Sequence, residues 1–349
     1  MNLDALNKIA VAMVAPGKGI LAADESASTI KKRFDAIGVE STEENRRDYR
    51  EMLFRAREAM ENCISGVILF DETIRQKAKD GTPLVQIIEA SGAIPGIKVD
   101  KGAKPLAGAP GETVTEGLDG LRERLAEYHG LGARFAKWRA GIDIGPSDRQ
   151  GGGRAMPSAY CINANMHALA RYAALCQEAN IVPIVEPEVL MDGDHDIDRC
   201  FEVTGFALRA LYAALYEQRV ALEGTILKPN MVIAGKKCAK QAGVGEVAEK
   251  TVKCFRAAVP AAVPGVVFLS GGQSDEQATA HLNAMNAAYR DVMPWPLSFS
   301  YGRALQAAPL KAWGGKAGNV KAGQAAFAHR AKMNSLAQRG EWSDGLEAA

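Results

Sequence analysis

The sequence has no excess of either charge and no uninterrupted apolar run long enough to cross a membrane. Its 42 Lys and Arg residues against 41 Asp and Glu give a formal net charge of +1. Proteins that bind nucleic acid or a membrane surface usually carry a strong basic excess or a basic amphipathic stripe. The most apolar stretch, residues 257–269, is interrupted by Pro260, Pro264 and Gly265, and it is too short to span a bilayer. We therefore expect neither nucleic acid nor a membrane as a partner.

The sequence also lacks the cysteine and histidine patterns that are typical of metal or disulfide proteins. The six cysteines include no C-x-x-C pair, which fits reduced thiols better than a disulfide framework or a zinc knuckle. The five histidines show neither H-x-H nor H-E-x-x-H spacing, which argues against a zinc-dependent mechanism. No basic segment followed by an apolar one begins the chain, so no signal peptide is expected. These absences predict a soluble, cytoplasmic protein without a metal.

What the sequence does contain is a short apolar run that recurs eight times and ends in polar residues. The runs cover residues 19–24, 66–71, 94–100, 134–139, 181–186, 224–228, 265–270 and 295–301. Such runs, rich in β-branched residues and bounded by Gly or Pro, suit parallel strands that are buried on both faces. Stretches with helical periodicity lie between them, including apolar stripes within residues 49–60, 118–128 and 207–216. A capping-box spacing at 41–44 precedes the first of these stripes.

Eight strands that alternate with helices in one uninterrupted chain predict an α/β fold, a (β/α)8 TIM barrel formed as a single domain over residues 1–349. An open, doubly wound sheet is the alternative. We expect residues from about 337 to 349 to form a flexible tail.

Polar residues at the strand ends locate the expected site, because the active site of a (β/α)8 barrel lies where the carboxyl ends of the strands meet the βα loops. These residues are Asp24, Asp71, Lys98, Lys137 with Arg139, Glu186 with Glu188, Lys228, Ser270-Gly271-Gly272 and Ser300-Tyr301-Gly302-Arg303. Strand ends are often polar simply because they meet solvent. Lysines at three ends and carboxylates at three others are harder to explain in that way, and they predict a shared site.

Three lysines, Lys98, Lys137 and Lys228, would repel one another around a common opening. Burial and nearby positive charge both disfavour an ammonium group, so the pKa of at least one lysine is expected to fall. A neutral amine can attack a ketone and form an iminium, which acts as an electron sink for the cleavage of a carbon–carbon bond. Neighbouring carboxylates can move the protons that this chemistry requires. The residue types therefore favour a Schiff-base mechanism.

The last two strands end in residues suited to an anion. Ser270-Gly271-Gly272 offers a hydroxyl and backbone N–H groups to a phosphate oxygen. Ser-Gly-Gly alone is more often only a turn. Arg303, however, follows the eighth strand, and the loops after strands seven and eight form the recurrent phosphate site of these barrels. Together the two segments predict a phosphate site.

Eight motifs, in order from about Gly17 to Leu336, resemble those of class I fructose-bisphosphate aldolases. They are Gly19-Ile-Leu-Ala-Ala-Asp-Glu-Ser26, Gly66-Val-Ile-Leu-Phe70, Lys98-Val-Asp-Lys-Gly102, Phe135-Ala-Lys-Trp-Arg139, Ile181-Val-Pro-Ile-Val-Glu-Pro-Glu188, Leu227-Lys-Pro-Asn-Met231, Leu269-Ser-Gly-Gly-Gln273 and Ser300-Tyr-Gly-Arg-Ala-Leu305. The resemblance implies a metal-free, cofactor-free lyase of glycolysis and gluconeogenesis. Such an enzyme reversibly cleaves fructose 1,6-bisphosphate to dihydroxyacetone phosphate and glyceraldehyde 3-phosphate. The resemblance also suggests a homotetramer.

The resemblance assigns catalytic roles residue by residue. Lys228 matches the lysine that forms the Schiff base. Glu186 matches the glutamate that acts as acid and base when the iminium forms and is hydrolysed, and Glu188 is its neighbour. Lys137 matches the lysine that helps to lower the pKa of the nucleophile and protonates intermediates. Asp24 matches the aspartate that assists deprotonation of the C4 hydroxyl during cleavage.

The resemblance also implies two phosphate-binding ends. The residues that match the C1-phosphate site are Ser270, Gly271, Gly272, Gly302 and Arg303, and the residues that match its lining are Ser300 and Tyr301. The residues that match the C6-phosphate end are Ser26 and Lys98. The residues that match basic side chains around the substrate are Arg33, Arg46 and Arg139. Thr29 stands where the family has a second serine and keeps the hydroxyl. The sequence ends in Glu347-Ala348-Ala349, without the terminal tyrosine of animal and plant members, so the proton donor of the enamine step stays open.

Other motifs are weighed and set aside. Residues 17–22 and 243–248 fit a loose dinucleotide fingerprint, but neither lies between a strand and a helix as that fingerprint requires. Residues 192–196 lack the order of ligands of a calcium loop and predict a solvated loop. Glu186 and Glu188 share one strand, whereas a glycosidase usually takes its two carboxylates from different strands.

Two alternative functions remain open at this stage. One is an aldolase that prefers fructose 1-phosphate, against which Ser26, Thr29 and Lys98 argue because they suit a second phosphate. The other is a non-catalytic scaffold with the same fold. Loss of a strand-end lysine or glutamate would favour the scaffold, and none is missing.

Overall fold

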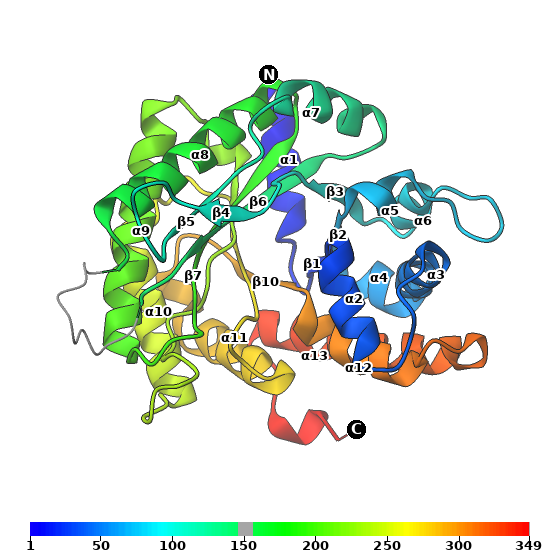
Figure 1. Ribbon diagram of the computed structural model, residues 1–349. Helices are drawn as coiled ribbons and strands as arrows, with labels where there is room; N and C mark the ends of the chain where they lie inside the picture. Colours follow the sequence, from blue (N-terminus) through cyan, green and yellow to red (C-terminus); the bar gives the residue numbers. More distant parts are fainter. Residues whose placement is uncertain (146–155, 349) are drawn as a thin grey trace.

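The computed structural model describes residues 1–145 and 156–348, in which parallel strands close into a barrel surrounded by helices (Figure 1). Within these residues the barrel strands are β1 Gly19–Ala23, β2 Ile64–Leu69, β3 Ile94–Lys98, β6 Phe135–Ile142, β7 Val182–Val189, β8 Ile226–Leu227, β9 Val266–Phe268 and β10 Leu297–Tyr301. Each strand pairs in parallel with the next along the chain, and β10 closes on β1 with Ile20 opposite Ser300. The predicted (β/α)8 barrel is confirmed, and the open sheet is wrong.

Helices follow the strands and cover the outside of the barrel. The α-helices of the described residues are α1 Leu3–Met13, α2 Ala27–Asp35, α3 Glu43–Phe54, α4 Arg57–Cys63, α5 Asp71–Arg75, α6 Leu84–Ala90, α7 Leu121–Gly130, α8 Ala159–Glu178, α9 Ile197–Glu217, α10 Val244–Ala258, α11 Asp275–Tyr289, α12 Arg303–Trp313 and α13 Val320–Arg339. Single 3₁₀ turns cover η1 Leu222–Gly224, η2 Arg290–Val292, η3 Ala317–Asn319 and η4 Asp344–Leu346. A short antiparallel hairpin, β4 Ala103–Pro105 with β5 Thr113–Thr115, lies between β3 and α7. The strands are therefore buried on both faces, as their apolar runs predict.

The helix predicted from the apolar stripe at 49–60 is interrupted. Its residues lie on two helices, α3 and α4, which are separated at Arg55 and Ala56. The cap also differs by one residue, because the Thr42 hydroxyl accepts the Asn45 N–H at 3.1 Å where the spacing points to Ser41. The stripe at 207–216 lies inside α9 as expected.

The amino-terminal end of the barrel is closed by apolar packing. Phe135 fills the interior, and a Cβ on Gly66 or Gly96 would lie only 2.9 or 2.2 Å from its ring, so both positions need glycine. Helix α1 covers this end, where the Ser65 hydroxyl donates to the Met13 carbonyl at 2.6 Å. The buried cluster comprises Leu6, Ala10, Met13, Val14, Ile20, Ala22, Ile68, Phe135, Val182, Ile184, Ile226 and Val267. With one end filled, polar side chains can gather only at the opposite end.

The carboxyl-terminal segment returns against the last helices. Helix α13 continues to Arg339, and beyond it the Trp342 N–H donates to Asn283 Oδ1 at 2.9 Å, while Glu347 pairs with Arg330. A flexible tail from about residue 337 stays a prediction. Across the described ranges, no helix combines the length and the apolar character that a membrane crossing requires.

Candidate active site

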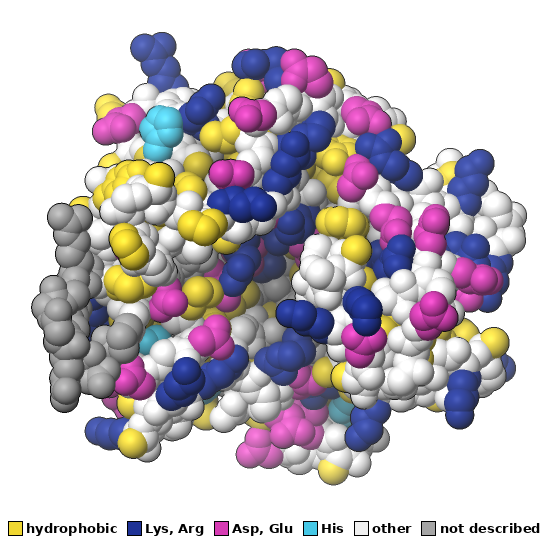
Figure 2. Space-filling model, in the orientation of Figure 1, with side chains coloured by type: hydrophobic (Ala, Val, Ile, Leu, Met, Phe, Trp, Pro, Cys, Tyr) yellow, Lys and Arg dark blue, Asp and Glu magenta, His cyan; other side chains and the backbone are white. Residues whose placement is uncertain are grey.

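A cavity of about 1170 Å³ opens where the strands end. Figure 2 shows the visible face of the molecule hollowed near its centre, with Lys and Arg side chains around the hollow. The predicted residues that line it are Asp24, Ser26, Thr29, Arg33, Lys98, Lys137, Arg139, Glu186, Glu188, Lys228, Ser270, Gly271, Ser300, Gly302 and Arg303. Residues that are far apart in the sequence thus meet at one end of the barrel, as strand-end positions predict.

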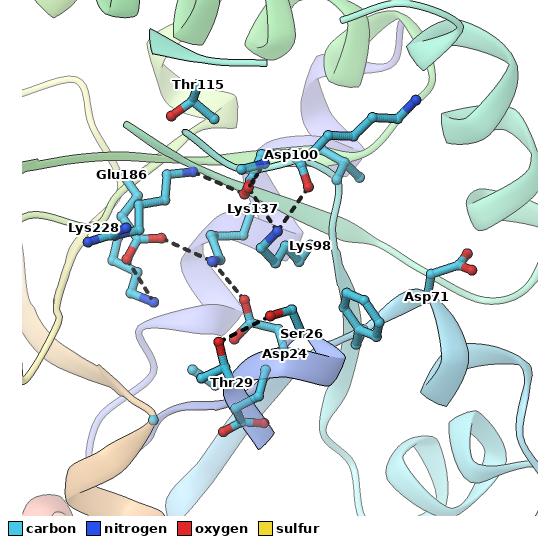
Figure 3. Close-up of a pocket in the computed structure, with 18 of the residues that line it drawn as sticks. Asp24, Ser26, Thr29, Asp71, Lys98, Asp100, Thr115, Lys137, Glu186 and Lys228 are labelled. Atoms are coloured by element: carbon cyan, nitrogen blue, oxygen red, sulfur yellow. Dashed lines mark hydrogen bonds and ion pairs between the residues drawn. The ribbon is translucent and has the colours of Figure 1, made fainter. Parts of the chain in front are cut away.

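Four side chains form a continuous row in the inner part of the cavity (Figure 3). Asp24 Oδ2 lies 2.7 Å from Lys137 Nζ, and the same nitrogen lies 3.3 Å from Glu186 Oε2. The other oxygen, Glu186 Oε1, lies 3.3 Å from Lys228 Nζ. The side chains of Glu186 and Lys228 are only 4% and 5% exposed, so bulk water does little to screen these charges. A single carboxylate therefore bridges the two lysines.

The barrel itself sets this spacing. Lys137 stands opposite Ile184 on the neighbouring strand β7, two residues before Glu186. Lys228 directly follows β8, and its backbone N–H donates to the Val185 carbonyl at 2.9 Å, which continues the strand pairing. The row is thus fixed by backbone hydrogen bonds on both sides of β7.

Pairing decides how the buried charges titrate. Burial alone would raise the pKa of the Asp24 carboxyl, but the charges of Lys137 and Lys228 outweigh it and lower this pKa from 3.8 to about 2. Burial would likewise lower the pKa of Lys137, but the charges of Asp24, Glu186 and Asp100 outweigh it and raise this pKa. Lys137 is therefore held as an ammonium. The fall in pKa expected of at least one lysine does not occur at Lys137, because carboxylates lie between the cations.

The Asp24 pair should make stability depend on acidity. Because the pKa of Asp24 is lower in the folded protein than in the unfolded chain, its contribution is complete above about pH 5 and is lost as the pH falls toward 2. That contribution is about 2 kcal/mol at neutral pH. We expect Asp24→Asn to lower the urea midpoint at pH 7 and to differ less from the wild type at pH 3. If the urea midpoints of Asp24→Asn and the wild type differ equally at both pH values, the Asp24 ion pair does not contribute this pH-dependent stability.

A second group of charges surrounds this row. Arg139 Nε pairs with Glu188, and although burial opposes the charged form, Glu188 raises the pKa of Arg139. Lys98 Nζ lies 2.8 Å from Oδ1 of Asp100, a buried residue that also lines the cavity. The strand-end prediction named only Lys98 for the third run, residues 94–100, and overlooked Asp100, which ends that run. Side-chain alternation would have found it, since residues i and i+2 share a face.

The predicted phosphate loop follows β9. Gly272 has φ of +79°, and a Cβ on Gly271 or Gly272 would lie 2.8 or 2.2 Å from the side chain of Met191. The left-handed backbone and the close approach of Met191 require glycine at position 272, and Gly271 lines the cavity. The Ser300 hydroxyl on β10 is buried in the cavity wall and makes no hydrogen bond with the described residues.

Arg303, the first residue of α12, joins this loop to the end of β10. Its guanidinium donates to the Ser270 carbonyl at 3.0 Å and to the Gln273 carbonyl, and it pairs with Asp275 Oδ1 at 3.0 Å. The two segments predicted to share a phosphate do therefore converge.

Hydroxyl groups gather at the beginning of α2, on another side of the cavity. Ser26 Oγ lies 3.1 Å from both Ser28 Oγ and Thr29 Oγ1. Thr29 thus supplies the hydroxyl expected of it. Ser28 also lines the cavity, and sequence reasoning missed it because no motif singled it out.

Three predicted residues do not line the cavity as the structure describes it. The Tyr301 hydroxyl donates to the Ala278 carbonyl at 2.9 Å, and its side chain is fully buried between the barrel and α11. Arg46 pairs with Glu72 at 2.5 Å and borders a separate groove. Gly272 lies behind Gly271, against Met191.

No group of three or more His, Cys, Asp or Glu side chains in residues 1–145 and 156–348 is arranged to hold a metal ion. The acidic loop at 192–196 follows β7, and its last residue, Asp196, caps α9 by accepting the Arg199 N–H at 2.8 Å. This agrees with the prediction of a βα loop.

These features define a (β/α)8-barrel protein with a buried lysine–carboxylate site between two groups of hydroxyl and cationic side chains. The chain belongs to the class I fructose-bisphosphate aldolase family. The sequence profile described as "Fructose-bisphosphate aldolase class-I" matches residues 5–349.

Relatives agree with this membership over most of their length. A Xanthomonas campestris protein named probable fructose-bisphosphate aldolase class 1 is 62% identical, and the match covers 98% of this chain and 99% of the relative. Fructose-bisphosphate aldolase C of Carassius auratus is 54% identical, with coverage of 98% and 92%. Fructose-bisphosphate aldolase 6, cytosolic, of Arabidopsis thaliana is 55% identical, with coverage of 94% and 88%.

A solved structure agrees as well. The aldolase of Plasmodium falciparum, crystallised in complex with TRAP and a small-molecule inhibitor, superposes with a TM-score of 0.93 at 48% identity. The match covers 98% of this chain and 96% of the Plasmodium chain. Fold and family therefore agree.

Proposed function

We propose that this protein reversibly cleaves fructose 1,6-bisphosphate to dihydroxyacetone phosphate and glyceraldehyde 3-phosphate through a Schiff base on Lys228. The observation that carries the proposal is Glu186, whose two oxygens lie 3.3 Å from the amines of Lys228 and Lys137. A nucleophilic amine with an acid–base group within reach is the arrangement that imine formation needs.

The proposed sequence of steps uses the buried row in order. The Lys228 amine attacks the C2 carbonyl, and Glu186 supplies and removes the protons as the carbinolamine loses water to become an iminium. Asp24, ionised at neutral pH, accepts the proton of the C4 hydroxyl. The C3–C4 bond then breaks, its electron pair moves into the iminium to form an enamine, and glyceraldehyde 3-phosphate leaves. Protonation of the enamine and hydrolysis release dihydroxyacetone phosphate and restore the amine.

Two anion-binding ends would orient the substrate across this row. We assign the C1 phosphate to the Ser270 loop and Arg303, and the C6 phosphate to Ser26, Thr29 and Lys98. Hydroxyls, backbone N–H groups and cations at both ends favour a bisphosphate over fructose 1-phosphate. The scaffold alternative is not favoured, because the side chains that catalysis needs are present and converge.

Trapping with borohydride tests the proposal directly. Dihydroxyacetone phosphate and sodium borohydride should convert the imine to a stable secondary amine, and peptide mass mapping should find the added mass on Lys228. Omitting the triose phosphate provides the control. Modification of another lysine, with Lys228 unlabelled, would reject the assignment of the nucleophile.

We propose that the reaction needs no metal and no cofactor, since the iminium itself withdraws the electron pair. Dialysis against EDTA is expected to leave kcat unchanged, and added zinc should have no effect. The measurement is the initial rate of cleavage before and after chelation. Activity that disappears in EDTA and returns with zinc would show a metal-dependent enzyme.

Location and assembly are part of the same proposal. Six free cysteines suit a reducing compartment, and the Arabidopsis relative is named as cytosolic, so we propose a cytoplasmic enzyme. The family resemblance suggests a homotetramer that acts on phosphorylated sugars and triose phosphates. Sedimentation at low protein concentration would test the assembly.

A further inference from the structure

The cavity contains a buried carboxylate for which the proposed reaction has no role. Asp100 lies two residues beyond Lys98, at the end of β3, and its side chain is 4% exposed. Buried aspartates are uncommon unless they are paired or hydrogen-bonded. The contacts of the Asp100 carboxylate therefore indicate its role in the site.

The Asp100 carboxylate is fixed by backbone groups on two sides. Oδ1 accepts the Gly102 N–H at 3.1 Å, within the same loop. Oδ2 accepts the Arg139 N–H at 3.4 Å, from the neighbouring strand β6. The loop is itself held by the β4–β5 hairpin, because the Lys101 N–H donates to the Glu116 carbonyl at 2.8 Å. The carboxylate is therefore rigid with respect to the barrel.

The Asp100 carboxylate and its backbone carbonyl hold the side chain of Lys98. Lys98 Nζ lies 2.8 Å from Asp100 Oδ1 and donates to the Asp100 backbone carbonyl at 2.9 Å. An ammonium group has three N–H donors. Asp100 can accept two of them, which leaves a third donor, and Lys98 lines the cavity. Figure 3 shows Lys98 beside Lys137, with Asp100 on one side of Lys98 and Ser26 on the other.

We propose that Asp100 is a positioning residue of this site, and that its backbone-anchored carboxylate holds the Lys98 ammonium ready for the C6 phosphate of the substrate. A lysine stem has several rotatable bonds, and ordering it on binding weakens affinity. Asp100 orders that stem before the substrate arrives. The inference rests on the proposed function, which assigns Lys98 to the C6-phosphate end.

The test compares two sugars that differ only at C6. In Asp100→Asn, which keeps the shape and removes the charge, KM for fructose 1,6-bisphosphate should rise about tenfold, the scale of losing one ordered charged contact. KM for fructose 1-phosphate, which has no C6 phosphate, should change less than about twofold. Equal losses with both sugars would indicate a merely structural role. A fall in KM for the bisphosphate would indicate that Asp100 competes with the phosphate, and either result would overturn the proposal.

Two further variants complete the design. Asp80→Asn removes a carboxylate outside the cavity, one that pairs with Arg55 at 2.6 Å, and should leave the constants for both sugars near wild type. Asp100→Glu restores the charge and should recover part of the discrimination between the sugars. The ratio of the KM for fructose 1,6-bisphosphate to the KM for fructose 1-phosphate should differ between Asp100→Glu and Asp100→Asn. An equal ratio would show that the carboxylate does not position Lys98, and this comparison holds even if the amide variant folds poorly.

The result is separable from the proposed function. Dihydroxyacetone phosphate has no C6 phosphate, so Lys228 of Asp100→Asn should still be labelled by borohydride at close to the wild-type level. If Lys228 of the wild type is not labelled, the proposed function fails. If it is labelled and the two sugars are affected equally, only the role of Asp100 fails.

Discussion

Replacing Lys228 with methionine is expected to lower kcat on the order of 10⁵-fold or more, the scale seen when an enzyme loses its nucleophile. Methionine has a similar length and suits a buried site, but it has no amine to attack the C2 carbonyl. The buried Glu186 would keep its contact with Lys137 at 3.3 Å, so its charge stays compensated. The measurements are the single-turnover rate of cleavage and the borohydride label, both of which should disappear.

Lys236→Met is the matched control. Lys236 lies in the loop after the same strand, half exposed and paired with Asp192 at 2.9 Å, so its loss should leave kcat within about twofold, as is usual for an exposed ion pair. Circular dichroism of both variants would show whether the barrel is intact. Cleavage by Lys228→Met at more than a hundredth of the wild-type rate would contradict a covalent mechanism through this residue.

Strand-end reasoning predicted the inner row well because it relies on a property of the backbone. Lys137 and Glu186 lie within β6 and β7, and Lys228 directly follows β8, so the closed barrel brings all three to the same cavity. The approximate strand boundaries were sufficient for this purpose. A shift of one or two residues changes the face on which a side chain lies, but not the end of the barrel at which it lies.

The sequence alone did not determine how the charges would pair. Three lysines around one opening led to the expectation of a lowered pKa, but Asp24 approaches Lys137 to 2.7 Å and reverses the effect for that residue. Distances of this kind depend on side-chain rotamers. Neither a strand boundary nor a motif specifies them.

Tyr301 and Arg46 do not line the cavity, and the physical reason differs between them. Ser300 and Tyr301 are adjacent on β10, so only one of them can face the barrel interior, and the smaller hydroxyl does so. The alternation rule would have separated them, whereas a motif match assigns both. Arg46 lies on α3, and the strand alternation rule does not apply to a helix, so the sequence does not show whether its side chain faces the cavity. In the structure it pairs with Glu72.

Glu186→Gln should lower kcat by about 10²–10⁴-fold, the usual contribution of a general acid–base group. Glutamine has nearly the same shape but can neither take up nor release a proton at neutral pH, and it leaves Lys228 without its carboxylate partner at 3.3 Å. The slow step should then be imine formation, so the rate of borohydride labelling should fall with kcat while the final extent of labelling remains. Glu127→Gln is the control, because Glu127 lines the same cavity but pairs with Arg75 at 2.5 Å, and its loss should cost little. If Glu186→Gln keeps kcat within threefold of the wild type, or loses kcat while imine formation stays fast, then another group carries the proton, and the bridge between the two lysines serves only to hold their charges.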